Sequence, residues 1–474
     1  MEKVWKNPMK SEKIMVERLL SFLFDTAFED LTPEIILQAK RCMVDWIGVT
    51  LGGLNHSSIS ILIQTVKELG GRRQATILGT PIKTSVLHAA LVNGAMSHVL
   101  DFDDTHLPAL MHPSAPLLPA LLAYGEWRKV NGKDILLAFV LGFEIETRIS
   151  MAMGTSHYNA GWHSTATMGR FGAATGVGKM AGLDRQKMAY ALGLAGTQAS
   201  GIRRVFGTMT KSFHPGKAAA DGLLSVLLAQ KGYTSPTDIL EGEKGLGSLF
   251  SSDFDPQRGL EGLGKSYTIM GVSFKPYASC LYTHPAIDGV IHLRNQLQIK
   301  PLDVEAIHCS VSKFCFDAAC IRDPQTGLEG KFSTPYCVSL ALIEGRAGED
   351  LFRDEAVKDQ AIRDVMKRVQ VEEKSELSDK EAEITIWLHD SRTMKHKVDY
   401  PLGDPENPLP DQKLDEKARS LLESIFEKER VEAVLKRLWD LESIENIEEL
   451  ISLLRKGDGR KKKIGPRSKR TNSK

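Results

Sequence analysis

The chain has 474 residues, of which 42% are hydrophobic and 26% charged, and its formal net charge is +1. No stretch reaches the roughly twenty apolar residues that span a bilayer, and the N-terminus has no secretory signal pattern, so we expect a globular cytoplasmic protein of about two domains without a membrane partner. The six cysteines are sparse for this length and include no CxxC pair, so the sequence indicates neither a disulfide framework nor a structural zinc site.

Residues 1–265 have the pattern of a large helical domain. Thr32 and Pro33 form an N-cap and first-turn pair ahead of a long apolar run that ends at glycines. Many of the helices are rich in Gly and Ala, which allows close helix contacts but costs up to about 1 kcal/mol of helix propensity per glycine, so tertiary packing must hold them. Further helices are predicted at about 84–100, 115–129, 133–152, 164–182, 185–199 and 217–232.

The periodicity changes in residues 266–402, which we predict to form a smaller α+β domain. The stretch Ile307 to Phe314 alternates apolar with polar residues, and EITIWLH alternates in the same way around Ile384 and Ile386. Helical runs are expected at about 332–345 and 353–368. The fold class is therefore mainly α, with a large all-helical domain and a smaller α+β domain.

Residues 403–455 begin within the proline-rich stretch PLGDPENPLP and continue with the apolar spacing of amphipathic helices, which we expect to pack back on the helical domain. The tail at 456–474 is basic, and from Arg455 onward the chain has ten Lys or Arg residues and one Asp. Because this end contains no aromatic residue for base stacking, we predict a disordered, solvated tail and no nucleic-acid partner.

The first candidate for a functional site is the stretch from Ser97 to Pro116, SHVLDFDDTHLPALMHPSAP. It gathers three aspartates, three histidines and a threonine between two predicted buried helices. Carboxylates and imidazoles at this density suggest a reactive loop. They also suit zinc or manganese, which would make the protein a metal-dependent hydrolase. The absence of an HExxH spacing and the many cations in the other polar stretches argue against a metal.

Four more stretches carry polar side chains in apolar surroundings, each beside a predicted helix end where free N–H groups can receive an anion. They are HYNAGWHSTATMGRFG, GIRRVFGTMTKSFHPGKAAADG, VSFKPYASCLYTHPAIDG and GKFSTPYCVSLAL. The set of Lys211, His214 and Lys217 favours anion binding over a solvated face. His163 has two interpretations, a pre-cap residue packed on Trp162 or a general acid/base at the mouth of a helix. GEKGLGS lacks the lysine and the preceding strand of a phosphate loop.

Taken together, these motifs resemble the MmgE/PrpD family, which includes 2-methylcitrate dehydratases, cis-aconitate decarboxylases and an iminodisuccinate epimerase. The likeness covers about residues 15–450 and rests on DFDDTH…HPSAP, GWHSTATMGRFGAA, TKSFHPGKAAADG and KPYASCLYTHPAID. It implies a helical domain with a smaller α+β lid, a homodimer, and a site between the domains. It also implies catalysis without metal, iron–sulfur cluster or nucleotide, so no cofactor is expected.

The resemblance carries the site positions of the cis-aconitate decarboxylase branch onto six residues of this chain, Asp101, Thr105, His112, His163, Lys211 and Lys275. Two departures stand out. Cys280 occupies a position where the decarboxylase pattern has histidine, and the loop between Thr105 and His112 is one residue longer. Both departures favour a dehydratase, an isomerase or an epimerase over a decarboxylase.

The chemistry of the residues also fits a di- or tricarboxylate substrate. Removing a proton next to a carboxylate gathers negative charge, which Lys211, Lys275 and Arg203 can offset where it develops. Imidazoles titrate near neutrality and suit proton transfer, and we assign His163 to this role with His112 as its partner.

The remaining assignments complete the predicted site. Asp101 orients a histidine or lysine, Thr105 hydrogen-bonds a carboxylate, and His214 and Tyr336 contact the substrate. Cys280 is either a proton donor or acceptor or an inert buried thiol. The sequence thus predicts a cofactor-independent lyase, a dehydratase of a hydroxy-polycarboxylate such as 2-methylcitrate, with an epimerase, isomerase or decarboxylase as the alternatives within the family.

Overall fold

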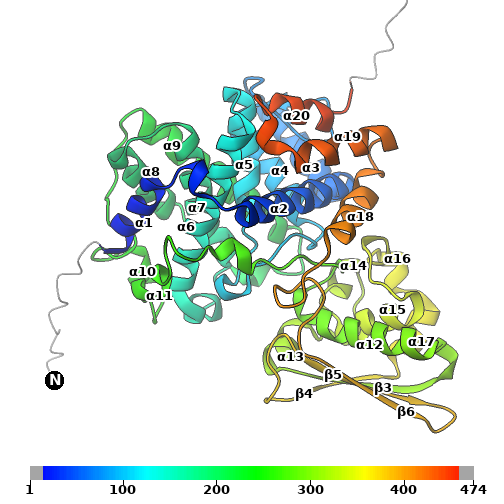
Figure 1. The fold of residues 1–474 in the computed structure, drawn as a ribbon. Helices are drawn as coiled ribbons and strands as arrows, with labels where there is room; N and C mark the ends of the chain where they lie inside the picture. The colour runs from blue at the N-terminus through cyan, green and yellow to red at the C-terminus, as the bar shows by residue number, and fades with distance from the viewer. Residues whose placement is uncertain (1–13, 458–474) are drawn as a thin grey trace, which may run out of the picture.

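The structure, a computed structural model, describes residues 14–457. The predicted basic tail at 456–474 therefore lies outside the described residues, apart from its first two positions. The prediction of a mainly helical fold with a smaller α+β part is confirmed (Figure 1). The helices of the first part are α1 (Ile14–Asp25), α2 (Pro33–Gly52), α3 (Ser57–Leu69), α4 (Val86–His98), α5 (Ser114–Arg128), α6 (Gly132–Asn159), α7 (Ser164–Met180), α8 (Arg185–Thr197), α9 (Thr210–Gln230), α10 (Leu246–Phe250) and α11 (Pro256–Leu260), beside a two-stranded ribbon of β1 (Ala75–Thr76) and β2 (Lys83–Thr84).

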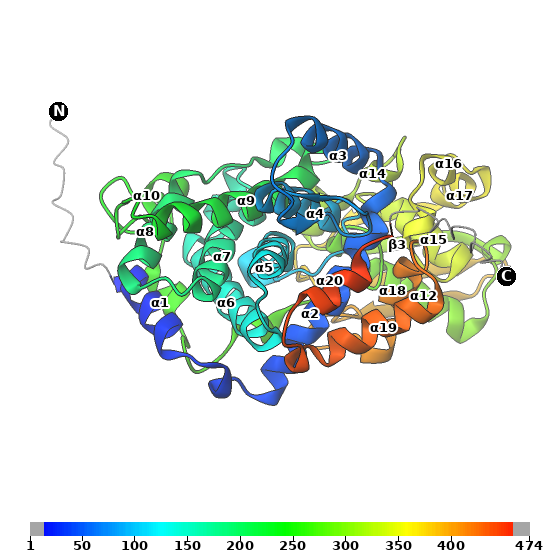
Figure 2. The same ribbon diagram turned by 90° about the horizontal axis from the view of Figure 1, so that it is seen from above.

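Helix α5 is the centre of the helical part. Its residues from Ser114 to Glu126 are all buried, because the sequence SAPLLPALLAYGE is apolar around the whole helix rather than on one face. Figure 2 shows α5 nearly end-on, with α4, α6, α7 and α9 around it. The N-terminus of α5 directly follows the stretch that the sequence singled out, so this stretch is anchored at the core.

Helices α4 and α9 approach each other unusually closely, at Gly94 and Gly216. A Cβ atom added to Gly216 would lie 2.1 Å from the carbonyl oxygen of Leu91, so only glycine allows this contact. The sequence predicted that the second helix begins near residue 217, after Pro215 and Gly216. It begins instead at Thr210, with Pro215 inside it. The earlier start places the first turns of α9, with Lys211 and His214, beside the C-terminal end of α4.

The second part consists of a four-stranded sheet with helices on one face, as Figure 1 shows for α12, α15 and α17. The strand order is β4-β3-β5-β6; β3 is parallel to β4 and antiparallel to β5. The elements are α12 (His284–Leu297), β3 (Val304–Val311), α13 (Lys313–Ala319), α14 (Gly327–Gly330), α15 (Thr334–Glu344), α16 (Asp354–Val357), α17 (Gln360–Met366), β4 (Val369–Glu373), β5 (Ala382–Leu388) and β6 (Thr393–Val398). We call residues 276–398, which include these elements and the segment that leads into α12, the lid.

Two predicted boundaries in the lid differ from the structure. The strand expected from Ile307 to Phe314 ends at Val311, because the Ser312 side chain accepts a hydrogen bond from the Cys315 backbone N–H and starts α13. The helix expected at 353–368 is divided into α16 and α17, because the Asp359 side chain caps a new helix start. The alternation that predicted the sheet is present, with Ile384 and Ile386 buried on the helix-covered face.

The C-terminal helices lie beside the helical part (Figure 2): the first two contact α2, and the third contacts the second. They are α18 (Asp411–Leu422), α19 (Lys428–Trp439) and α20 (Glu448–Leu454). Ala418 of α18 contacts Gly48 of α2 so closely that a Cβ atom on that glycine would lie 2.8 Å from the Ala418 Cα. This contact carries the neighbouring Lys417 toward the loop that follows α4.

All six cysteines are free, and Cys320 alone is partly exposed.

Within residues 14–457, no single helix is long and apolar enough to cross a membrane, although Pro33–Asn55 and Ser57–Leu69, bent by 84°, meet the length and composition criteria as a pair.

Candidate active site

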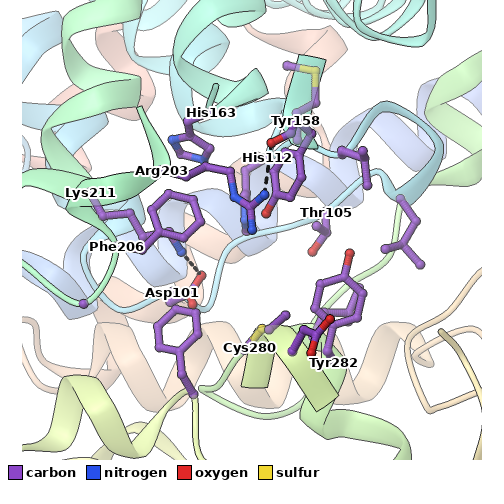
Figure 3. Close-up of a pocket in the computed structure, with 18 of the residues that line it drawn as sticks. Asp101, Thr105, His112, Tyr158, His163, Arg203, Phe206, Lys211, Cys280 and Tyr282 are labelled. Atoms are coloured by element: carbon purple, nitrogen blue, oxygen red, sulfur yellow. Dashed lines mark hydrogen bonds and ion pairs between the residues drawn. The ribbon is translucent and has the colours of Figure 1, made fainter. Parts of the chain in front are cut away.

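A cavity of about 420 Å³ lies between the helical part and the lid. Figure 3 shows His163, Arg203 and Lys211 on one side of it and Cys280 and Tyr282, which belong to the lid, on the other. The residues that line it are Asp101, Thr105, Leu107, Leu110, Met111, His112, Tyr158, Gly161, His163, Arg203, Phe206, Gly207, Lys211, Lys275, Cys280, Leu281, Tyr282, Asp317, Ala318, Ile321 and Phe332.

The loop after α4 is held by three buried lysines, each of which donates a hydrogen bond to one of three consecutive backbone carbonyls. Asp101, the middle residue, has φ 51°, a left-handed conformation that Asp tolerates better than most residues. The lysines come from the lid, the domain junction and α18, so three distant parts of the chain fix the loop. The pairs are Leu100 with Lys331 at 2.5 Å, Asp101 with Lys275 at 2.8 Å, and Phe102 with Lys417 at 2.7 Å.

The carboxylate of Asp101 joins two cations at the cavity wall. Its Oδ1 lies 3.0 Å from Lys211 Nζ and 3.1 Å from Lys275 Nζ, and both ammonium groups are largely buried. Burial raises the pKa of Asp101, but the two lysines outweigh this effect and hold the pKa well below its usual range. Asp101 is therefore ionised, and it keeps two positive charges side by side in the cavity wall.

A second carboxylate, that of Asp103, contacts two histidines. Its Oδ2 lies 2.8 Å from His98 Nδ1 and 3.2 Å from His112 Nδ1. Burial raises the pKa of Asp103, and the two imidazoles outweigh it, so the pKa lies well below its usual range. Burial lowers the pKa of His98 to about 4, which leaves that ring neutral. His112 is also fixed through its backbone N–H, which donates to Thr165 Oγ1 in the first turn of α7 at 3.0 Å.

His163 precedes α7 and faces the cavity, and its Nδ1 lies 2.9 Å from Nδ1 of His214. One nitrogen must donate and the other accept, so the contact needs at least one neutral ring. Burial lowers the pKa of His163 well below its usual range, helped by His98, His214 and Lys211. Burial likewise lowers the pKa of His214 to about 4. At neutral pH His163 is thus an uncharged proton acceptor or hydrogen-bond donor, not an imidazolium.

Two polar groups on the wall are ready to bind a ligand. The Arg203 guanidinium stacks on the Tyr158 ring, 3.8 Å from its centroid, and donates from Nη1 to the Tyr158 carbonyl at 3.0 Å. Arg203 Nε is buried and has no hydrogen-bond partner among the described residues. The buried Oγ1 of Thr105 likewise has no partner within residues 14–457. Both can hydrogen-bond an oxygen of a bound molecule without losing a protein contact.

The lid wall is mainly apolar, and its polar groups are the Cys280 thiol, Tyr282 and the carboxylate of Asp317, which pairs with Lys313. Cys280 is 9% exposed, and its backbone N–H donates to the Lys331 carbonyl at 2.8 Å. Burial, together with the nearby Asp101, raises the pKa of the Cys280 thiol. Cys280 is therefore a neutral thiol at physiological pH and can act as a proton donor, but not as a ready nucleophile.

The donor atoms of His98, Asp101, Asp103 and His112 lie within 4.8 Å of one another, close enough to hold a metal ion. The charges around them do not suit one. Asp101 is already neutralised by Lys211 and Lys275, whose ammonium groups lie about 3 Å away and would repel a divalent cation. We therefore derive no chemistry through a metal.

Eight of the ten predicted site residues line the cavity: Asp101, Thr105, His112, His163, Arg203, Lys211, Lys275 and Cys280. The structure does not bring the other two to it. His214 lies behind His163, because the first turn of α9 points it at that ring. Tyr336 is fully buried in the lid, where its hydroxyl donates to the Leu351 carbonyl at 2.6 Å. Lys217, named with Lys211 as an anion ligand, instead pairs with Asp221 outside the cavity.

Sequence reasoning missed three kinds of contributor. It assigned no site role to Asp103, although this carboxylate contacts two imidazoles. The density of acids in DFDD was the available signal. It gave no role to Tyr158, whose ring holds Arg203, because a single tyrosine in HYNAGWH carries no pattern. The apolar wall, including Phe206 and Phe332, has no sequence signal at all, since apolar residues line cores more often than cavities.

Comparison with known proteins adds an independent line of evidence. The MmgE/PrpD N-terminal domain matches residues 17–259, and the MmgE/PrpD C-terminal domain matches residues 277–441. The chain is 25% identical to a cis-aconitate decarboxylase of Aspergillus terreus, over 90% of this chain and 93% of that protein. It is 27% identical to the Homo sapiens cis-aconitate decarboxylase, over 90% and 91%. A 2-methylcitrate dehydratase of Escherichia coli (strain K12) is 23% identical, over 68% and 70%.

Proposed function

Because the chain belongs to the MmgE/PrpD family, we propose that it is a lyase that acts on a small tricarboxylate and transfers a proton at a carbon next to a carboxylate. The observation that carries this proposal is the composition of one cavity, in which Lys211, Lys275 and Arg203 stand beside His112 and His163. Cations of this number suit a polyanion, and imidazoles suit proton transfer.

Substrate binding uses the charges and the free donors of the wall. Three cations face one carboxylate, Asp101, so this wall carries an excess of positive charge. One substrate carboxylate would take the free Nε of Arg203, and Thr105 Oγ1 would bind another oxygen. The two lysines would then lie where negative charge develops as the carbanion or its enolate form appears.

The histidines of the cavity are the groups that would transfer the proton. Nδ1 of His112 faces Asp103, which leaves Nε2 as the atom that can exchange a proton with the substrate. His163 is neutral and can hydrogen-bond the substrate from the same wall. His112 is therefore our leading proton-transfer residue, with His163 as its partner, the reverse of the order that the sequence suggested.

Decarboxylation is the first candidate for the reaction itself. The likeness to the cis-aconitate decarboxylases extends over nine-tenths of the chain. The apolar wall formed by Phe206, Ile321 and Phe332 would also strip water from a carboxylate that departs as CO2. Loss of CO2 leaves its electron pair on carbon. One proton then completes the product, delivered by the neutral Cys280 thiol or by His112 after it has taken up a proton from solvent.

Dehydration is the second candidate, and Cys280 favours it. This residue stands where the decarboxylase pattern has histidine, and its thiol remains protonated. The departure of a hydroxyl group as water needs a proton donor, which a neutral thiol can supply, while His112 removes the proton from the neighbouring carbon. The same groups act in the reverse direction on an unsaturated tricarboxylate.

Incubation of the purified full-length protein with cis-aconitate and, separately, with 2-methylcitrate tests the proposal. Proton NMR spectra of the mixtures would reveal loss of CO2 from the first or loss of water from the second. Lys211→Met should remove the activity, whereas Lys217→Met on the same helix should retain it, because Lys217 pairs with Asp221 outside the cavity. Folded protein that changes neither compound would contradict the proposal.

A further inference from the structure

His112 is backed by two buried residues that the substrate would not touch. Asp103 is 0% exposed, and His98 is 2% exposed. A single oxygen, Asp103 Oδ2, lies 2.8 Å from His98 Nδ1 and 3.2 Å from His112 Nδ1, and the two imidazole rings meet edge to face with centroids 4.6 Å apart. Neither Asp103 nor His98 lines the cavity between the helical part and the lid.

We propose that Asp103 and His98 are positioning residues that set the tautomer and the orientation of His112. This inference rests on the proposed function, because it concerns the same proton transfer. The contact of His112 Nδ1 with Asp103 is electrostatic, at 3.2 Å and without hydrogen-bond geometry in this structure. An ionised carboxylate offers only acceptor atoms, so it favours the tautomer whose proton lies on the ring nitrogen that faces it. His112 therefore has Nδ1–H toward Asp103 and an unprotonated Nε2 toward the cavity, the form that can take a proton from carbon.

Asp101 and Asp103, two aspartates of the loop after α4, have different partners. Asp101 neutralises lysines, and its nearest cations are Lys211 and Lys275. Asp103 has no lysine or arginine within ion-pair distance among the described residues, so the imidazoles are its polar partners. When His112 gains a proton, the resulting imidazolium lies next to this carboxylate and is stabilised by it.

His98 holds the carboxylate in place. Its Nδ1 makes the shorter of the two contacts with Asp103, and its buried Nε2 has no hydrogen-bond partner within residues 14–457. Within the described residues, the polar contact of the His98 imidazole is thus Asp103. A rigid C-terminal end of α4 carries His98, so the carboxylate is tied to a helix and not only to the loop.

The kinetic test compares Asp103→Asn with Asp104→Asn. An amide at 103 can donate to Nδ1 and reverse the tautomer, so kcat should fall by about 10²–10⁴-fold while KM changes less than about threefold. Asp104 is the matched control, since it is equally buried in the same loop but bonds Ser114. Asp104→Asn should leave kcat within threefold, and Asp103→Glu should recover part of the loss. An Asp103→Asn enzyme with normal kcat and wild-type folding would overturn the proposal.

A spectroscopic test needs neither turnover nor a variant of Asp103. Long-range ¹⁵N–¹H spectra of the full chain with labelled histidine report which ring nitrogen carries the proton, and His112→Gln identifies the His112 signal. The proposal predicts the Nδ1–H form of His112 in the wild type; an Nε2–H form would overturn it. Absence of lyase activity would reject the proposed function without changing this tautomer, so the two failures can be told apart.

Discussion

Lys275 donates a hydrogen bond to the backbone carbonyl of Asp101 at 2.8 Å, and the same ammonium lies 3.1 Å from the Asp101 carboxylate. One lysine therefore fixes both the backbone and the side chain of the residue that ends the turn after α4. Because Lys275 lies at the junction of the two parts and Asp101 in the helical part, this contact forms only when the junction packs on the loop after α4.

Asp101→Asn tests the role of this pair. Asn tolerates the left-handed backbone as Asp does, so the turn should persist while Lys211 and Lys275 lose their shared negative charge. We expect kcat/KM for the tricarboxylate to fall by about 100-fold, the size of loss that a displacement of about 1 Å causes. Steady-state kinetics on the folded variant measure it. An unchanged kcat/KM would mean that Asp101 does not position the lysines.

Lys417→Met tests the lysine that holds the loop from α18. Its ammonium lies 2.6 Å from Asp45 Oδ1 and also donates to the carbonyl oxygens of Phe102 and Lys275. Removing one partner leaves the buried Asp45 without its cation, and we expect a loss of about 3–5 kcal/mol in unfolding free energy. Adding Asp45→Asn should restore part of that loss in urea unfolding. Equal stability of the single and double variants would show that the pair is not coupled.

Much of the site could be predicted, because its polar groups are concentrated in short motifs whose local order survives folding. Asp101, Thr105 and His112 lie in one such motif, and the structure does place them on one cavity. The hydrogen bonds from distant lysines to the loop after α4 could not be predicted in this way. Lys331 and Lys417 are 231 and 315 residues from their carbonyl partners, and no local pattern reports contacts at such distances.

The fold could likewise be predicted where a local pattern decides the structure, and not where distant contacts decide it. Two-residue alternation predicted the sheet of the lid, because burial of one face dictates it. The early start of α9 was missed, because Pro215 and Gly216 are poor helix residues taken alone, while in the structure the glycine is required by the contact with α4. Tertiary packing outweighed the local preference there.

Tyr158 should influence substrate binding through Arg203. The guanidinium stacks on the ring at 3.8 Å and bonds the Tyr158 backbone, so the aromatic face matters and the hydroxyl group does not. Tyr158→Phe should keep KM within about twofold, whereas Tyr158→Leu should raise it up to about tenfold, the worth of one cation–π contact. Initial-rate measurements over a range of substrate concentrations separate the two. The same KM in both variants would contradict the stacking role.

Acid should destabilise the protein through its buried histidines, and His106 allows the effect to be isolated. Burial lowers the pKa of His106 to about 4, and the ordinary value of about 6.5 applies in the unfolded chain. Between these values the unfolded state binds the extra proton, so stability is lost as the pH falls from 6.5 to 4, with a slope of about 1.4 kcal/mol per pH unit for each such proton.

His106→Asn removes the group that binds this extra proton when the chain unfolds. The side chain lies outside the cavity lining, and its Nδ1 accepts from the Ala109 N–H, a bond that Asn can also accept. Urea unfolding at pH 5 and pH 7 should therefore differ less for the variant than for the wild type. Equal differences would mean that His106 is not buried in its neutral form.

The central claim, proton transfer to carbon in this cavity, is tested most directly by turnover of cis-aconitate in D2O followed by mass spectrometry of the product. Decarboxylation and hydration of this compound both place one solvent hydrogen on carbon, so either reaction gives a product with one non-exchangeable deuterium. His112→Gln should form little or none of it. A product without deuterium on carbon, or folded wild-type protein that turns over neither cis-aconitate nor 2-methylcitrate, would contradict the account.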